Sequence, residues 1–247
     1  MIIPPVLTYH SVDESESWTS ISPILFRQQM DYLSRNGYQC LSLRNWIEIL
    51  ISGKSPPRKS FVITFDDGYK NNYEVALPIL KACQFTATIF VVTGALNKSS
   101  AWERLRGIPD LPILSREEVR ELSMSGIDIQ PHSHTHTALT TLDNKQIKEE
   151  LLTSKKEIGE ITGKEADIFC YPYGYYSSNI IDLLKEAGFK SAVTIDFGRD
   201  RPGADPFRLR RIGSAHFRTL LRFRLVMAGW YDLYITSRKV LRRSNLS

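Results

Sequence analysis

Two adjacent aspartates, Asp66 and Asp67, follow the apolar run from Phe61 to Phe65 and precede Gly68. Carboxylates at the end of a buried strand are costly to bury unless they are paired or bound to a metal. Neighbouring side chains of a strand point in opposite directions, so we expect the two acids to have different roles. A single Asp-Gly more often marks a turn or a helix cap, but a pair of acids favours a functional site.

Three of the five histidines lie within five residues, at His132, His134 and His136. Residues four apart are about 13 Å apart in a strand, too far to share one ion. In a helical turn they lie about 6 Å apart on one side, and Pro131 can begin such a turn. We therefore predict a helical turn in which His132 and His136 bind one metal ion while His134 points elsewhere.

Two histidines and one carboxylate leave open positions on a bound ion. This ligand set suits Zn²⁺ in a hydrolase and also Fe²⁺, Co²⁺, Mn²⁺ or Ni²⁺, with Zn²⁺ as our first choice. Asp66, the acid left unligated, would then serve as a base on water activated by the metal. A third segment, Phe169 to Gly174, indicates by itself only a strand that enters a Pro/Gly turn.

Strands and helices alternate along most of the chain, and they must position these residues. This alternation predicts a parallel sheet, and parallel α/β folds place active sites where strands end. It does not separate a closed barrel from an open sheet, although the phosphate-binding pattern G-x-G-x-x-G is absent. The expected strands are 6–9, 61–65, 87–92, 127–130, 168–171 and 190–194, and the expected helices are 23–36, 43–52, 72–83, 115–124, 144–162 and 178–187.

The composition is that of an ordinary globular protein. The 247 residues are 42% hydrophobic and 24% charged, with a formal net charge of +5. The length suits one large α/β domain or two small ones. Cys40, Cys83 and Cys170 are odd in number and far apart, so we expect reduced thiols. The first residues lack the features of a secretory signal. We therefore expect a cytoplasmic protein or one peripheral to the inner face of the membrane.

Together these segments resemble the polysaccharide deacetylase family, also known as NodB-homology proteins or carbohydrate esterase family 4. Residues 64–68 resemble the motif T-F-D-D-G, residues 132–136 resemble H-[ST]-x-x-H, and residues 169–174 resemble the third motif, over a match from about Val6 to Ile212. The resemblance implies a distorted (β/α) barrel with a divalent metal at one mouth. It also implies that N-acetyl groups are removed from an amino sugar in a polysaccharide or glycan precursor.

The resemblance also assigns roles to individual residues. It implies Asp66 as the general base and, as the metal ligands, Asp67, His132 and His136. The backbone N–H of Tyr173 would stabilise the oxyanion, together with the metal. Contacts with the carbohydrate substrate are expected from the motif residues Tyr69, Pro172 and Tyr173.

The sequence departs from the commoner family pattern in two places. Cys170 stands where the third motif usually begins with an arginine that orients the base. The last motif, Leu-x-His, supplies the general acid, and His216 is the only late candidate for it. These departures keep a second interpretation open, in which the protein is a catalytically inactive glycan-binding protein of the same fold.

One branch of the family, the circularly permuted poly-N-acetylglucosamine deacetylases, accounts for both departures. Leu7 to Val12 resembles the start of that branch, in which an N-terminal histidine replaces the acid, and this implies His10 as the general acid. The alternative is a core histidine bonded to backbone. Arg211 lies in a segment similar to the branch's Leu-Pro-Arg-Ile, with Arg210 in the place of proline, and would supply the missing arginine.

The composition changes near the C-terminus. We therefore divide the chain into a deacetylase domain, 1–215, and a basic, aromatic C-terminal segment, 216–247, in which Asp232 is the only acid. Such a segment is typical either of a final helix packed on the barrel, which we favour, or of a helix at an anionic membrane surface. We expect no nucleic-acid partner, because no recognition motif accompanies the charge.

Overall fold

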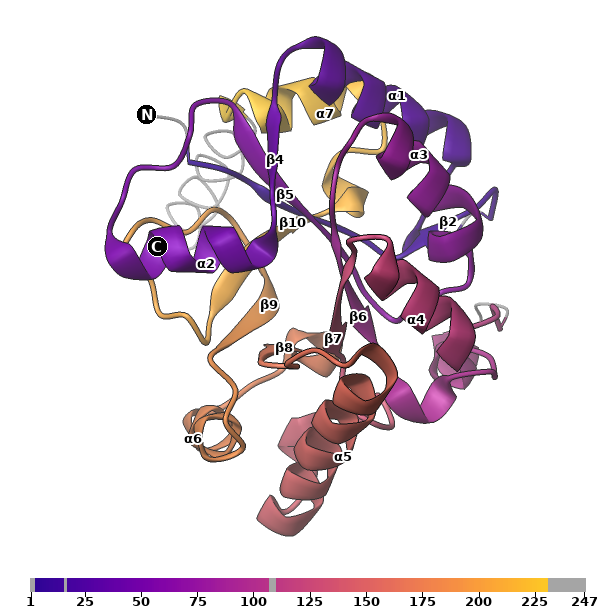
Figure 1. The fold of residues 1–247 in the computed structure, drawn as a ribbon, viewed down its shortest axis with the longest axis vertical. Coiled ribbons are helices and arrows are strands. Elements are labelled where there is room, and N and C mark those ends of the chain that lie inside the picture. The colour runs from indigo at the N-terminus through magenta and orange to yellow at the C-terminus, as the bar shows by residue number, and fades with distance from the viewer. Residues whose placement is uncertain (1–2, 16, 107–109, 231–247) are drawn as a thin grey trace, which may run out of the picture.

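A parallel β-sheet curls into a nearly closed barrel in this computed structural model, which describes residues 3–15, 17–106 and 110–230 (Figure 1). Seven strands follow the order β7-β6-β5-β1-β10-β9-β8, and β4 pairs with the first half of β5. The sheet comprises β1 (Val6–Tyr9), β4 (Gln39–Leu41), β5 (Ser60–Phe65), β6 (Thr88–Val91), β7 (Asp128–Pro131), β8 (Ile168–Cys170), β9 (Ser191–Phe197) and β10 (Leu209–Gly213). The short strands β2 (Ser11–Val12) and β3 (Ser20–Ile21) form a separate parallel pair.

Helices surround the outside of the barrel (Figure 1). Most begin at a side-chain cap, such as Ser22 of α1, or the capping box that Ser115 and Glu118 form in α4. Pro78 lies where a π-helical segment, Asn72–Ala76, gives way to a short α-helix. The helices are α1 (Pro23–Arg35), α2 (Leu43–Ser52), α3 (Leu77–Ala82), α4 (Arg116–Met124), α5 (Asn144–Thr162), α6 (Ser178–Glu186) and α7 (Leu220–Met227).

The barrel closes between β7 and β8, the two ends of the strand order. The buried side chain of Gln130 on β7 reaches across this seam. Its Oε1 accepts hydrogen bonds from the backbone N–H groups of Asp167, at 3.1 Å, and Ile168, at 2.9 Å. A side-chain amide therefore satisfies backbone donors that an open sheet edge would leave exposed. Strand alternation alone is compatible with an open sheet, and this contact between β7 and the start of β8 shows that the sheet instead closes into a barrel.

Strand β10 is the longest strand that the sequence analysis missed, besides the short strands β2, β3 and β4. It lies between β1 and β9, and its residues alternate between buried Leu209, exposed Arg210 and buried Arg211. Arg210 and Arg211 interrupt the apolar pattern from which a buried strand is predicted. Arg211 is nevertheless buried, at 2% exposure.

The C-terminal residues up to Trp230 belong to the same packed body. Helix α7 lies beside α1 (Figure 1), and it buries Phe223, Val226 and Met227 in the core that also contains Phe65. This packing favours the first interpretation of the C-terminal segment as far as it is described. The later aromatic and basic residues, from Tyr231 onward, lie outside the described residues.

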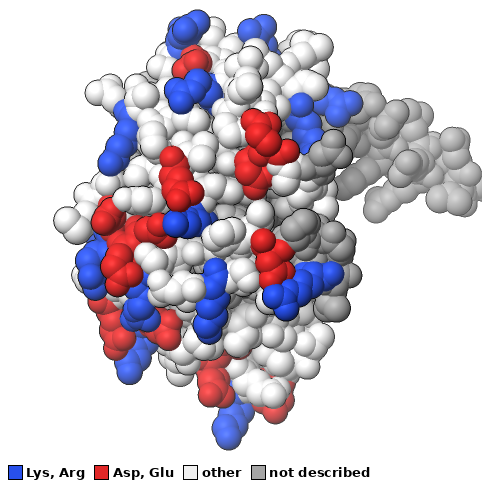
Figure 2. All heavy atoms as spheres, turned by 90° about the vertical axis from the view of Figure 1, so that its right-hand side faces the viewer, with Lys and Arg blue, Asp and Glu red and all other residues white. Residues whose placement is uncertain are grey.

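The surface charge is mixed where it can be followed. Figure 2 shows acidic and basic side chains interspersed on one face, with no broad area of one sign. Within the described part of the chain, no helix is both long enough and apolar enough to span a membrane.

Candidate active site

A cavity of about 300 Å³ opens at the carboxyl ends of the barrel strands. This is the edge at which parallel α/β folds place their chemistry. The residues that line it come from segments far apart in the sequence and include His10, Trp18, Asp66, Asp67, His132, His136, Tyr171, Tyr173, Tyr175, Ile195, Arg211 and His216.

Three buried residues at the floor of this cavity form a candidate metal centre. The Oδ1 atom of Asp67 lies 3.4 Å from Nε2 of His132 and 3.3 Å from Nε2 of His136. Two metal–ligand bonds of about 2.0–2.1 Å at a tetrahedral angle would place their ligand atoms about 3.4 Å apart. The two distances from Asp67 therefore match a small divalent cation, and the three ligand atoms all lie within 4.8 Å of one another.

The backbone that presents these histidines is not the helical turn expected from their spacing, and that prediction is wrong. Pro131 is the last residue of β7, and Ser133 (φ 62°) and His136 (φ 61°) adopt left-handed conformations. These residues turn the chain so that the rings of His132 and His136 are 4.9 Å apart. Left-handed backbone costs about 1–2 kcal/mol per non-glycine residue, so other contacts must hold this loop.

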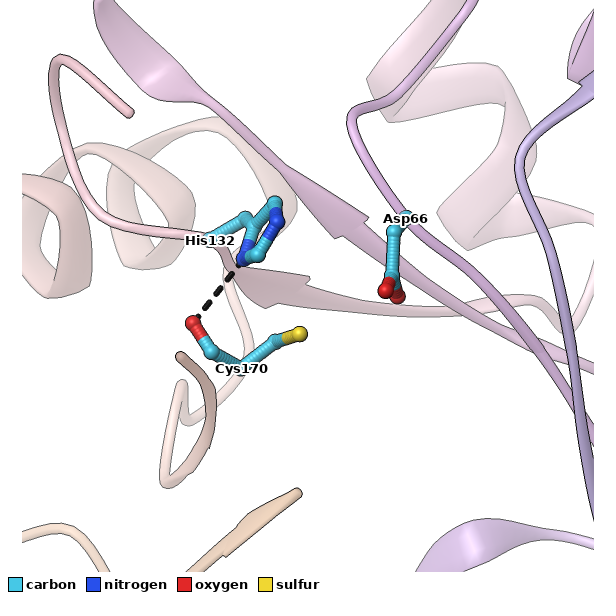
Figure 3. Close-up of side chains that lie close together, drawn as sticks. All are labelled: Asp66, His132 and Cys170. Carbon is cyan, nitrogen blue, oxygen red and sulfur yellow. Dashed lines mark hydrogen bonds between the residues drawn. The ribbon is translucent and has the colours of Figure 1, made fainter. Parts of the chain in front are cut away.

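Each of the two histidines is oriented by its neighbours. Nδ1 of His132 donates to the carbonyl oxygen of Cys170 at 2.9 Å (Figure 3), which leaves Nε2 facing Asp67. His136 is held between the stacked ring of Trp102 and the edge-on ring of Tyr173, each at 4.6 Å. The sequence analysis missed Trp102, which carries no motif and precedes His136 by more than thirty residues.

The protonation of this cluster is set by burial and by its partners. Burial raises the pKa of Asp67, but hydrogen bonds from both histidines outweigh burial and hold that pKa well below its ordinary value. Burial lowers the pKa of both histidines. Contacts with Cys170 and Asp67 overcome it for His132, whose pKa is well above its ordinary value, whereas the pKa of His136 stays lowered. An ionised carboxylate therefore faces two ring nitrogens.

Asp66 has a different partner from Asp67, although the alternation of strand side chains is not the reason, because β5 ends at Phe65 and Asp67 has a left-handed backbone (φ 72°). The two terminal nitrogens of Arg211 donate to its two carboxylate oxygens, both at 2.7 Å. Burial raises the pKa of Asp66, but the charge and hydrogen bonds of Arg211 outweigh burial and lower it. Asp66 is therefore ionised at neutral pH, in the bidentate geometry that guanidinium and carboxylate favour.

Arg211 is itself fixed by further contacts. It is 2% exposed, its Nε donates to the carbonyl oxygen of Thr194 at 2.8 Å, and one terminal nitrogen donates to Oγ1 of Thr64 at 3.2 Å. The other lies 3.3 Å from Sγ of Cys170. Arg211 and Cys170 thus meet at Asp66, although 41 residues separate them in the chain.

A second group of metal-ligating types, Asp66, His132 and Cys170, also converges (Figure 3). Both oxygens of Asp66 already accept from Arg211, and so does the sulfur of Cys170. Burial raises the pKa of the Cys170 thiol, so it is protonated at neutral pH. A resident guanidinium and a neutral thiol make this group a poor cation site, and the Asp67 cluster fits better.

Two histidines at the cavity are candidates for an acid. His10, just after β1, places Nε2 3.9 Å from Oδ2 of Asp66, and Asn72 fixes its backbone by donating to the His10 carbonyl at 2.8 Å. His216 also lines the cavity, with its ring 4.7 Å from that of Phe197, and burial lowers its pKa. The proximity to Asp66 favours His10.

The third motif supplies a wall of the cavity through Tyr173. This residue has a left-handed backbone (φ 59°) and precedes Gly174, where an added Cβ would lie 2.3 Å from Ile195. Two other expected substrate contacts are not at the cavity. The side chain of Tyr69 is 1% exposed in the hydrophobic core, and Pro172 is buried and does not line the cavity. Tyr69 and Pro172 are therefore left out of the proposed site.

The family model for polysaccharide deacetylases matches residues 53–192, more than half of the chain, and the protein belongs to that family. The chain is 29% identical to YxkH of Bacillus subtilis (strain 168), whose name places it among the polysaccharide deacetylases. That match covers 84% of this chain and 70% of YxkH.

Two further relatives refine the comparison. A poly-beta-1,6-N-acetyl-D-glucosamine N-deacetylase of Staphylococcus aureus (strain MSSA476) is 26% identical, over 78% of this chain and 67% of the relative. The solved structure of IcaB from Ammonifex degensii superposes with a TM-score of 0.79 at 25% identity and covers 93% of this chain and 97% of its own. The expected family and the expected distorted barrel are both confirmed.

Proposed function

We propose that this protein is a metal-dependent hydrolase that removes N-acetyl groups from an amino sugar in a polysaccharide. The observation that carries the proposal is the pair of carboxylates at one cavity. Asp67 faces two histidine nitrogens at 3.3 and 3.4 Å, and Asp66 is held ionised by Arg211. The similarity to a poly-beta-1,6-N-acetyl-D-glucosamine N-deacetylase supports that polymer as the first substrate to test.

Asp67, His132 and His136 would hold the metal. Two imidazoles and one carboxylate suit Zn²⁺, our first choice, and also Co²⁺, Fe²⁺, Mn²⁺ or Ni²⁺. When bound, the ion supplies a Lewis acid for the acyl carbonyl and lowers the pKa of the attacking water. The protein provides an ionised carboxylate for this purpose and two rings fixed by Cys170, Trp102 and Tyr173.

Asp66 would act as the general base. It accepts a proton from the water molecule that adds to the acetyl carbon, and Arg211 keeps the carboxylate ionised and aimed for this transfer. Arg211 therefore takes the place of the arginine that the third motif lacks.

His10 would complete the reaction as the general acid. Its Nε2 lies 3.9 Å from Asp66 and faces the same cavity, so it can donate a proton to the amine nitrogen as the C–N bond breaks. The products are acetate and the free amino sugar. The backbone N–H of Tyr173 would donate to the oxyanion, and the exposed rings of Trp18 and Tyr175 offer faces for neighbouring sugars.

Release of acetate from poly-β-1,6-N-acetylglucosamine and from shorter N-acetylglucosamine oligomers tests this function. Metal-loaded protein should release acetate, and chelated protein and the Asp66→Asn variant should not. Metal binding without acetate release from any N-acetylated glycan would contradict the enzyme and favour the glycan-binding interpretation.

A further inference from the structure

The loop from His132 to His136 carries two of the three proposed metal ligands on a backbone that is unfavourable by itself. Ser133 and His136 both have left-handed φ values, near 62° and 61°. Ser133 supports the loop locally, since its Oγ accepts from the backbone N–H of His136 at 3.0 Å. In the middle of the loop, the N–H groups of His134 and Thr135 donate to a side chain from another element.

That support comes from one buried carboxylate on helix α5. Oε2 of Glu150 accepts hydrogen bonds from the consecutive backbone N–H groups of His134, at 2.8 Å, and Thr135, at 2.9 Å. Oε1 accepts from the hydroxyl of Thr135 at 2.7 Å. The residue is 8% exposed. A buried carboxylate with three donors from one loop is a strong restraint, because charge-assisted hydrogen bonds are short and directional.

Glu150 acts on the back of the loop and not at the cavity that contains Asp66. His134, with its Nδ1 2.9 Å from the Thr93 hydroxyl, lines a separate hollow together with Thr135 and Glu150. The loop is also pressed against Gly94, where an added Cβ would lie 2.7 Å from the His134 carbonyl oxygen. The loop is therefore packed between the turn that follows β6, which contains Gly94, and helix α5, which contains Glu150.

We propose that Glu150 is a positioning residue for the metal-binding loop and that it sets the affinity and geometry of the metal centre without touching metal or substrate. This inference rests on the proposed function, since it needs a metal at Asp67, His132 and His136. Groups that orient metal ligands through hydrogen bonds commonly change metal affinity by about 10–100-fold when they are removed.

The test compares Glu150→Ala and Glu150→Gln with the wild type in the full chain. The Kd for Zn²⁺ is measured by competition with a chromophoric chelator, and the absorption spectrum of the Co²⁺ form reports ligand geometry. We expect Glu150→Ala to raise Kd by about 10–100-fold and to change the Co²⁺ spectrum. Glu150→Gln keeps one acceptor oxygen for the two backbone N–H groups, so it should show a smaller, several-fold rise.

Glu149→Ala is the matched control, because Glu149 is the exposed neighbour on the same helix. It should leave both the Kd and the spectrum unchanged. A purely structural role for Glu150 would lower the melting temperature of the chelated protein but leave both metal readouts unchanged in the folded protein. If Glu150→Ala does not fold, Glu150→Gln alone decides.

The outcomes separate this inference from the proposed function. Wild-type metal binding with an unchanged Kd and spectrum in the folded Glu150 variants would overturn the positioning role alone. A wild-type protein that binds neither Zn²⁺ nor Co²⁺ would overturn the proposed metal centre and this inference with it.

Discussion

The two adjacent aspartates stand in opposite surroundings. Asp66 has a resident cation, Arg211, on both of its oxygens, whereas Asp67 faces two imidazole nitrogens that can exchange a proton for a metal ion. Both carboxyl groups have lowered pKa values, but for different reasons. The difference shows that two aspartates at adjacent positions can take different roles, a base for Asp66 and a metal ligand for Asp67, because the fold gives them different partners.

The largest expected effect separates the two carboxylates. Asp66→Asn should reduce kcat by about 10²–10⁴-fold while one divalent ion still binds, because the proposed ligands are intact. Asp67→Asn should lose activity because the metal is lost. Acetate release together with metal analysis of both purified variants checks this. Equal loss of metal in both variants would contradict the assignment of different roles to Asp66 and Asp67.

Removing the resident cation should be the next largest change. Arg211→Met leaves Asp66 buried without its partner and should lower the free energy of unfolding by about 3–5 kcal/mol. Urea denaturation measures the loss. The double variant with Asp66→Asn is the control, and it should recover part of the stability because no buried charge is left unpaired. Additive losses would show that the pair does not interact.

Another buried carboxylate, Asp200, shows what happens when burial outweighs the charge of a nearby arginine, Arg210. Burial raises its pKa to about 6, although it accepts from the backbone N–H of Arg210 at 2.7 Å. The folded state then favours the protonated acid. This contribution is full below the unfolded pKa of about 3.9 and is lost as the pH rises through about 6.

Asp200→Asn removes that titration. Relative to the wild type, its free energy of unfolding should increase by up to about 3 kcal/mol between pH 4 and pH 7, since one pKa unit corresponds to about 1.4 kcal/mol. Urea denaturation at both pH values checks this, with the exposed Asp182→Asn as the control. Parallel pH profiles for wild type and Asp200→Asn would contradict the raised pKa.

The smallest expected effect concerns the seam between β7, which leads to the metal ligand His132, and β8. Gln130→Leu leaves the N–H groups of Asp167 and Ile168 without their acceptor and should cost about 2 kcal/mol of stability. Urea denaturation measures it, and the exposed Gln28→Leu is the control. No loss in Gln130→Leu would show that the seam does not depend on this side chain.

The sequence predicts the strands and helices well where a local pattern exists. Helix α5 is bounded by a capping box at Asp143 and by left-handed Gly163, and its predicted range agrees with the structure. Strand β10 was missed because its arginines interrupt the apolar pattern, and one of them, Arg211, is buried only because Asp66 is there to pair with it. Local periodicity contains no information about such a distant partner.

The candidate site divides in the same way. The motifs bring out Asp66, Asp67, His132 and His136, and their placement at one cavity follows from the strands that end there. The spacing of His132 and His136 predicted a helical turn. Spacing alone cannot reveal the left-handed backbone of this loop, which is supported by hydrogen bonds to the distant Glu150. Trp102, Gln130 and Glu150 lie in ordinary patterns, and only the fold shows what they contact.

The most direct test of the two-carboxylate arrangement is the stoichiometry of tightly bound Zn²⁺ in the wild type, Asp66→Asn and Asp67→Asn, measured on the same preparations by metal analysis after dialysis. We predict one ion per chain in the wild type and in Asp66→Asn, and none in Asp67→Asn. Retention of the ion by Asp67→Asn with its loss from Asp66→Asn would contradict this and place the metal at Asp66, His132 and Cys170.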